Sequence, residues 1–74
     1  MDAHNLVQMA NRIGDFFEAM PDHAEAVEGI ANHIQKFWEP RMRRELFAHI
    51  DREADAGLHA MVLEALRLHR SQLA

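Results

Sequence analysis

Residues 21–44 read PDHAEAVEGIANHIQKFWEPRMRR, and this stretch places two helix boundaries in the chain. Pro21 ends a helix that comes before it, because the residue preceding a proline avoids the α region. Asp22, with Glu25 three positions later, resembles a capping box, in which the side chain of the first residue accepts a hydrogen bond from a first-turn amide. Pro40 has no amide hydrogen and therefore suits the first turn of another helix. The stretch thus predicts one helix between the two prolines and a helix on either side of it.

Apolar side chains recur at spacings of three and four along the chain, a pattern typical of amphipathic helices that bury one face. Helices are expected over about residues 2–20, 22–38, 40–56 and 59–71, the first of them capped by Asp2. The side chains expected to face inward are Leu6, Met9, Ala10, Ile13, Phe16, Phe17, Met20, Val27, Ile30, Ala31, Ile34, Phe37, Met42, Leu46, Phe47, Ile50, Leu58, Met61, Val62, Ala65, Leu66 and Leu73. The predicted fold class is all-α, a small compact bundle of about four short helices.

Two glycines and three basic residues predict further details of this bundle. Gly14 weakens the first helix by about 1 kcal/mol relative to alanine, which suggests that it lets another helix approach closely. Gly57 is expected in the left-handed conformation that commonly follows the last turn of a helix. Arg67, His69 and Arg70 are expected in the last turn of the fourth helix, where positive charge suits the helix dipole.

Composition excludes several classes of protein. The chain has 74 residues, 49% of them hydrophobic, which fits one folded domain over residues 1–74. It contains no cysteine, which excludes disulfides and thiolate metal ligands and fits a reducing cytoplasm. The net charge of -4 disfavours nucleic-acid binding. Neither a membrane-spanning run nor a signal peptide is expected, because no apolar run is long enough and the first residues lack a basic flank.

Catalytic and metal-binding patterns are weak. No two of the six histidines are three or four positions apart, so no metal-binding pair on one helix is predicted, although convergence between helices stays open. They are His4, His23, His33, His49, His59 and His69, and we expect them to be surface and capping residues. The carboxylate pairs Asp15 with Glu18 and Glu25 with Glu28 fit solvated helix faces. Ser71 is the only serine, and threonine and tyrosine are missing, which disfavours a nucleophilic hydroxyl. We therefore expect a non-enzyme with no catalytic, cofactor-binding or metal-binding residues of its own.

The segment FWEPRMRR, which begins at Phe37, is the candidate binding surface. Phe37 continues the apolar stripe of its helix, whereas Trp38 lies about 100° further around and is expected at the edge of the core. Arg41, Arg43 and Arg44 fall in the first turns of the next helix, where each exposed positive charge opposes the dipole by about 0.3–1 kcal/mol. One interpretation is a solvated turn with local ion pairs. The other is a docking patch, since Trp and Arg are enriched in interface hot spots. The predicted partner-binding residues are Trp38, Arg41, Arg43 and Arg44.

Three segments carry a resemblance to a known family. LVQMANRIGDFF, PDHAEAVEGIANHIQKFWEPRMRREL and GLHAMVLEAL are similar to the small delta subunit of bacterial NAD-dependent formate dehydrogenase. The most specific parts are MAN at 9–11, PD at 21–22 and HIQKFWEPRMR at 33–43. The sequence departs from the family at Ala60, where a proline is common, but alanine also suits the first turn of a helix.

The resemblance implies a partner and a cellular setting. In this family soluble, cytoplasmic complexes oxidise formate to carbon dioxide with NAD, and the larger subunits hold a molybdenum or tungsten pterin cofactor, iron–sulfur clusters and FMN. The delta subunit carries no redox centre and would dock on the catalytic alpha subunit to support its assembly and stability. A dissociable maturation factor is the alternative, with the arginines steering the anionic pterin cofactor into its subunit. A remote alternative is a small helical DNA-binding regulator. A homodimer of the isolated chain also stays open.

Overall fold

A computed structural model of the protein describes residues 2–53 and 57–74. Over these residues the chain forms five helices and no strand, which confirms the all-α fold class. The helices are α1 (Ala3–Glu18), α2 (His23–Phe37), α3 (Pro40–Glu53), α4 (Ala60–Leu68) and α5 (Arg70–Leu73). The radius of gyration is 11.1 Å, close to the value of about 11 Å expected for a compact chain of this length. None of the described helices is long and apolar enough to cross a membrane.

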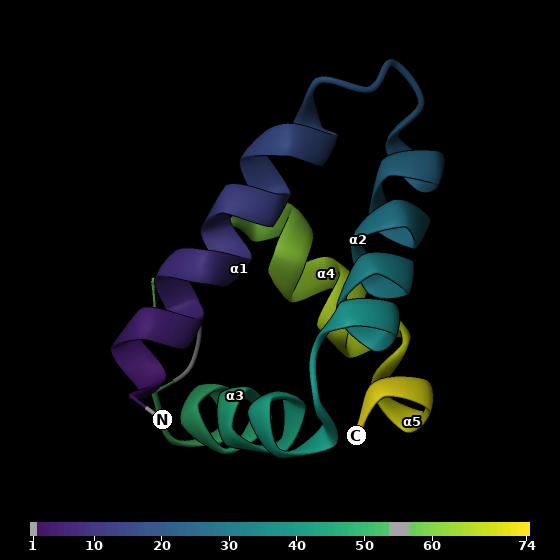
Figure 1. The fold of residues 1–74 in the computed structure, drawn as a ribbon. Coiled ribbons are helices and arrows are strands. Elements are labelled where there is room, and N and C mark those ends of the chain that lie inside the picture. The colour runs from purple at the N-terminus through teal and green to yellow at the C-terminus, as the bar shows by residue number, and fades with distance from the viewer. Residues whose placement is uncertain (1, 54–56) are drawn as a thin grey trace.

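The helices surround one core in an arrangement that Figure 1 shows plainly. α1 and α2 form the two sides of an inverted V, and α4 lies behind them and contacts both. α3 runs across the open end of the V and contacts α1, while the short α5 contacts α2 and α4. The turn at the tip of the V is the segment around Pro21. One side of the α1–α2 pair is therefore covered by α4, and the other side faces the viewer.

Side chains from every helix build the core. The largest fully buried ones are Leu6, Val27, Ile30, Ile34, Leu46, Val62, Leu66 and Leu73. Of the side chains expected to face inward, only Phe16 and Phe37 are exposed, and for these two the prediction is wrong. The apolar periodicity therefore predicted the buried faces correctly in the interior of each helix and failed near the ends of α1 and α2.

Local sequence signals account for the helix starts. The Asp2 carboxylate accepts a hydrogen bond from the His4 amide at 3.1 Å, and the Asp22 carboxylate accepts one from the Glu25 amide at 3.0 Å. Both N-caps are therefore confirmed. α3 begins at Pro40 as predicted. Gly57 has a φ of 78°, the predicted left-handed conformation, while the expected end of the third helix near residue 56 lies outside the described residues.

The fourth predicted helix, 59–71, is divided, which corrects the sequence-based expectation. α4 ends at Leu68, because His69 has φ -112° and ψ 25°, and α5 begins at Arg70. The change of direction brings Leu73 into the core, where it is fully buried. Arg67 keeps its place in the last turn of α4, but Arg70 opens the next helix instead of closing this one.

An ion pair fixes α5 against α3. Arg70 donates to both carboxylate oxygens of Asp51, at 3.0 and 2.7 Å, and its guanidinium lies 4.7 Å from the centroid of the Phe47 ring. The hydrogen bond from Arg70 lowers the pKa of Asp51 and in turn raises the pKa of Arg70. Both groups are exposed to water, so the pair acts as a positioning contact and adds little to stability.

Gly14 marks the closest approach of α1 to the beginning of α4. A Cβ at this position would lie 2.7 Å from Cγ and 3.0 Å from Cβ of His59, and 2.9 Å from a methyl carbon of Val62. These atoms belong to the first turn of α4, so they move only if the helix moves. The predicted role of Gly14 in helix approach is confirmed.

We expect Gly14→Ala to lower the free energy of unfolding by about 1–2 kcal/mol. Overpacking against α4 costs about 1–3 kcal/mol, and alanine returns at most about 1 kcal/mol through helix propensity. Urea unfolding followed by circular dichroism measures the difference. Asn5→Ala, an exposed change in the same helix, serves as the control and should change the free energy of unfolding by about 0.5 kcal/mol at most. A Gly14→Ala protein at least as stable as the natural chain would contradict the close contact.

Candidate functional site

The structure reverses the predicted roles of Phe37 and Trp38. Trp38 is 5% exposed and belongs to the core, whereas Phe37 is 69% exposed. The reason is that α2 ends between them. Trp38 is the C-cap residue and has an extended backbone, φ -95° and ψ 133°, so its side chain no longer follows the helical spacing and turns inward. The expectation that Trp38 lies at the edge of the core is therefore wrong, and Trp38 is a core residue of the described structure.

The three arginines of FWEPRMRR separate into two groups. Arg43 is half-buried, and its Nη1 donates to the backbone carbonyl of Gln35 at 3.0 Å, in the last turn of α2. This bond satisfies a carbonyl that the helix end leaves free and holds α3 against α2. Arg41 and Arg44 are exposed at the start of α3. Of the four predicted partner-binding residues, Arg41 and Arg44 are the exposed ones.

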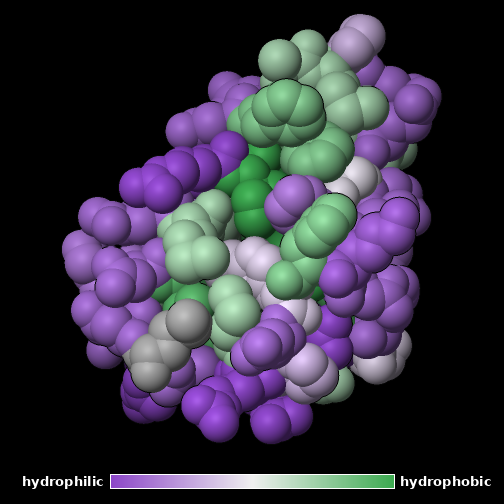
Figure 2. Space-filling view, viewed as in Figure 1, coloured by the Kyte–Doolittle hydropathy of each residue, from purple (hydrophilic) through white to green (hydrophobic). Residues whose placement is uncertain are grey.

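Aromatic rings gather on the side of α1 and α2 that α4 leaves open. The Phe16 and Phe17 centroids are 5.2 Å apart, Phe17 lies 6.3 Å from the ring of His33, and His33 lies 4.9 Å from Phe37. We call these four residues the aromatic face. Figure 2 shows apolar side chains along this side of the molecule, from the tip of the V downward between the helices. Phe16 is 73% exposed, so water covers much of this surface.

A shallow groove lies within the aromatic face. It has a volume of about 310 Å³ and is lined by Arg12, Ile13, Phe16, Phe17 and His33. The ring of Phe17 lies over Gly29 of α2, where any side chain would collide with it. Because Gly29 has no side chain, the Phe17 ring can pack against the backbone of α2 at this position. The groove offers apolar walls and one cation, which is the chemistry of a protein-binding surface.

The sequence contained a signal for this surface. Two adjacent aromatic pairs, Phe16 with Phe17 and Phe37 with Trp38, lie near the helix ends, and neighbouring residues on a helix point about 100° apart. One member of each pair must therefore leave the core of so thin a bundle. The expectation that Phe37 lies inward and Trp38 at the edge is wrong for both members of the second pair, and the expectation that Phe16 and Phe17 both face inward is wrong for Phe16.

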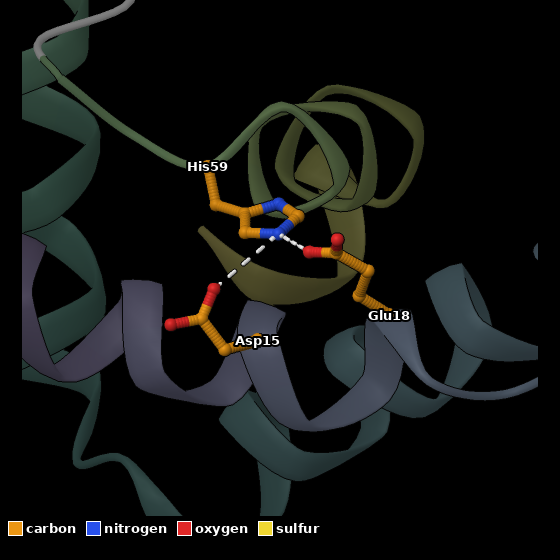
Figure 3. Close-up of side chains that lie close together, drawn as sticks. All are labelled: Asp15, Glu18 and His59. Atoms are coloured by element: carbon orange, nitrogen blue, oxygen red, sulfur yellow. Dashed lines mark hydrogen bonds and ion pairs between the residues drawn. The ribbon is translucent and has the colours of Figure 1, made fainter.

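A second cluster joins α1 to the beginning of α4, and Figure 3 shows its three side chains. Nε2 of His59 lies 2.5 Å from a carboxylate oxygen of Glu18 and 3.7 Å from one of Asp15. The carboxylates are three positions apart on α1, as the sequence indicated. Their convergence with His59 depends on the contact between α1 and α4, so no spacing along the chain could predict it. Asp15, Glu18 and His59 are the group in the described part of the chain with metal-ligand geometry.

The hydrogen bonds of His59 argue against a metal at this cluster. The amide of Met61 donates to Nδ1 at 3.1 Å, so Nδ1 bears no hydrogen and a neutral ring carries its proton on Nε2. That nitrogen donates to Glu18 and has no lone pair for a metal, whereas a metal-bound histidine donates through its other nitrogen. His59 is thus an N-cap of α4 and a link to α1, as the capping interpretation of the histidines predicts.

Neighbouring contacts strengthen the same junction. Asn11 accepts a hydrogen bond from the His59 amide at 2.8 Å and donates to the Gly57 carbonyl at 3.1 Å. Two further pairs join α2 to the chain around α4, since His23 Nε2 lies 2.9 Å from Glu64 and His69 Nε2 lies 2.7 Å from Glu28. Histidines therefore link helices in this small bundle, and the exposed aromatic face is one part of the described surface that these contacts leave unexplained.

Comparison with known proteins gives the family. The chain matches the model of the NADH-dependent formate dehydrogenase delta subunit, FdsD, over residues 5–66, which include the whole aromatic face and FWEPRMRR. No curated protein and no solved structure matches it. Because the match covers most of the chain, the protein belongs to the NADH-dependent formate dehydrogenase delta subunit family.

Proposed function

We propose that the chain is a non-catalytic accessory subunit that docks through its aromatic face on the catalytic alpha subunit of formate dehydrogenase. That subunit would carry the molybdenum or tungsten pterin cofactor, and formate oxidation with NAD would take place entirely in the larger, cytoplasmic subunits with their iron–sulfur clusters and FMN. Docking would support the assembly and stability of the complex. Family membership supports a partner among the other formate dehydrogenase subunits, and the exposure of Phe16 and Phe37 supports the aromatic face as the binding surface.

The exposed rings are the observation that carries this proposal. Phe16 and Phe37 each expose more than two thirds of their surface, in a chain that needs its apolar residues to build a core. Their rings connect through Phe17 and His33 into one surface, and such contiguous apolar patches mark binding sites. Aromatic side chains bury a large area on binding and dominate interface energetics.

A cation lines the groove of this surface, others follow Phe37 in the sequence, and all of them fit an acidic rim on the partner. Arg12 lines the groove, and Arg41 and Arg44 follow Phe37 at the start of α3 with exposed side chains. We propose that these arginines contact carboxylates of the alpha subunit around an apolar centre formed by the rings. Arginine suits this role because it binds carboxylates through two parallel hydrogen bonds. Trp38 and Arg43 contribute indirectly, by holding the α2–α3 turn in place.

The maturation alternative keeps one observation in its favour. Arg41 and Arg44 are exposed in the first turns of α3, and a helix N-terminus with arginines suits the pyrophosphate of a pterin dinucleotide. A DNA-binding regulator needs a basic face, which the net charge of -4 disfavours.

Removing the gene and purifying the remaining enzyme separates the roles. We expect the alpha subunit to retain its molybdenum or tungsten, measured by elemental analysis, while the complex dissociates or loses activity faster on heating. An intact complex without metal would instead favour the maturation role. An enzyme that stays intact, loaded and equally stable would contradict both.

A further inference from the structure

The outer face of α4 presents an apolar hollow that belongs to neither the core nor the aromatic face. Its volume is about 470 Å³, and it is lined by Ala60, Leu63, Glu64, Arg67 and Leu68. The opposite face of the helix is buried in the core, and yet Leu68 is 68% exposed on this side. α4 therefore carries apolar side chains on both faces, which is typical of a helix covered on both sides.

The spacing of the lining residues is that of a helix-packing hole. Ala60, Leu63, Glu64 and Arg67 stand at positions i, i+3, i+4 and i+7, the four residues that surround one knob in knobs-into-holes packing. Leu68 lies beside the hole and projects from the surface, so it has the shape of a knob. One short helix thus supplies both parts of a helix–helix contact.

We propose that α4 of a second copy of this chain occupies the hollow, antiparallel to the first and related to it by a two-fold axis. The two-fold axis crosses the outer face of α4 at the level midway between Ala65 and Leu66. This register places Leu63 opposite Leu68 of the other copy, and it places Glu64 opposite Arg67 of the other copy. The Leu68 knob of each copy then enters the hole of the other. Each contact occurs twice, as a two-fold symmetric interface requires.

The charges on this face favour a copy of the same chain over a strongly charged partner. The face carries one acid and one base, so its net charge is zero. Within the described residues Arg67 forms no ion pair, and Glu64 is bound only to His23, through Oε1 at 2.9 Å. A carboxylate can accept several hydrogen bonds, so Glu64 keeps its contact with His23 and also accepts a hydrogen bond from Arg67 of the other copy.

The contact is small, so the dimer is weak. A helix of nine residues is about 13.5 Å long, and two such helices bury far less than the roughly 1,200 Å² of a standard interface. We expect the isolated chain to be monomeric when dilute and to dimerise as its concentration approaches the millimolar range. This association shares no residue with the aromatic face, so it stands independently of the proposed docking.

Charge reversal tests the pairing by analytical ultracentrifugation of the full chain. Glu64→Arg and Arg67→Glu each place like charges at both symmetric contacts, so each variant alone should dimerise about tenfold more weakly or worse. An equimolar mixture restores both pairs and should form heterodimers at least as readily as the natural chain. His23→Gln is the control for the internal partner of Glu64 and should leave dimerisation unchanged, and circular dichroism checks that each variant is folded.

Cysteine cross-linking tests the antiparallel register, because the natural chain has no cysteine. Under mild oxidation near millimolar concentration, Leu63→Cys mixed with Leu68→Cys should give mainly heterodimers. Each variant alone should cross-link several-fold more slowly. Three results would each overturn the proposal. They are a natural chain that remains monomeric at about 1 mM, single charge reversals that dimerise like the natural chain, and cross-links that are mainly homodimeric.

Discussion

Trp38→Ala is expected to unfold most of the protein, whereas Phe37→Ala next to it should leave the fold intact. Truncating a buried tryptophan costs about 3–5 kcal/mol, which equals the roughly 3–5 kcal/mol that a single core supplies in a domain of this size. Trp38 is packed among the core residues, whereas Phe37 is mostly in water and contacts the ring of His33. Its removal should cost at most about 1 kcal/mol.

Circular dichroism at 222 nm during urea unfolding measures both effects, since Trp38 is the only tryptophan and its fluorescence is lost in the first variant. Leu6→Ala, a fully buried truncation in α1, calibrates the scale at about 2–5 kcal/mol. The reverse order, with a stable Trp38→Ala and an unfolded Phe37→Ala protein, would restore the orientation predicted from sequence periodicity.

The helix boundaries could be predicted because they depend on covalent properties of single residues. Pro21 and Pro40 restrict the backbone wherever they stand, and Asp2 and Asp22 cap their helices with their own side chains. The interior faces followed equally well from apolar spacing, since a continuous helix fixes the direction of each side chain.

The candidate site was harder to predict, because it lies where helical spacing stops. Periodicity cannot decide between Phe37 and Trp38, because α2 ends at Phe37 and the backbone of Trp38 is extended. The bond from Arg43 to the Gln35 carbonyl likewise depends on the angle between α2 and α3. The break between α4 and α5 at His69 accompanies packing that brings Leu73 into the core. It could not be predicted, because the sequence has no proline or glycine at that point.

The second large effect concerns docking. Replacing both exposed rings in Phe16→Ser/Phe37→Ser should weaken binding to the larger formate dehydrogenase subunits about 100-fold or more, because each aromatic hot spot contributes about 2 kcal/mol or more. The fold should survive, since both side chains lie mostly in water.

Arg41→Glu/Arg44→Glu should reduce binding as well and make it more sensitive to salt, as expected for exposed charges at an interface rim.

Affinity capture tests the docking surface most directly. The larger subunits, purified from cells that lack this chain, are immobilised and titrated with the natural protein, with Phe16→Ser/Phe37→Ser and with Leu68→Ser. Leu68→Ser is the matched control, since it removes an equally exposed apolar side chain from α4, away from the aromatic face. We predict that the double variant loses binding while the control binds like the natural chain. A double variant that is folded by circular dichroism and is captured as tightly as the natural protein would contradict docking through the aromatic face.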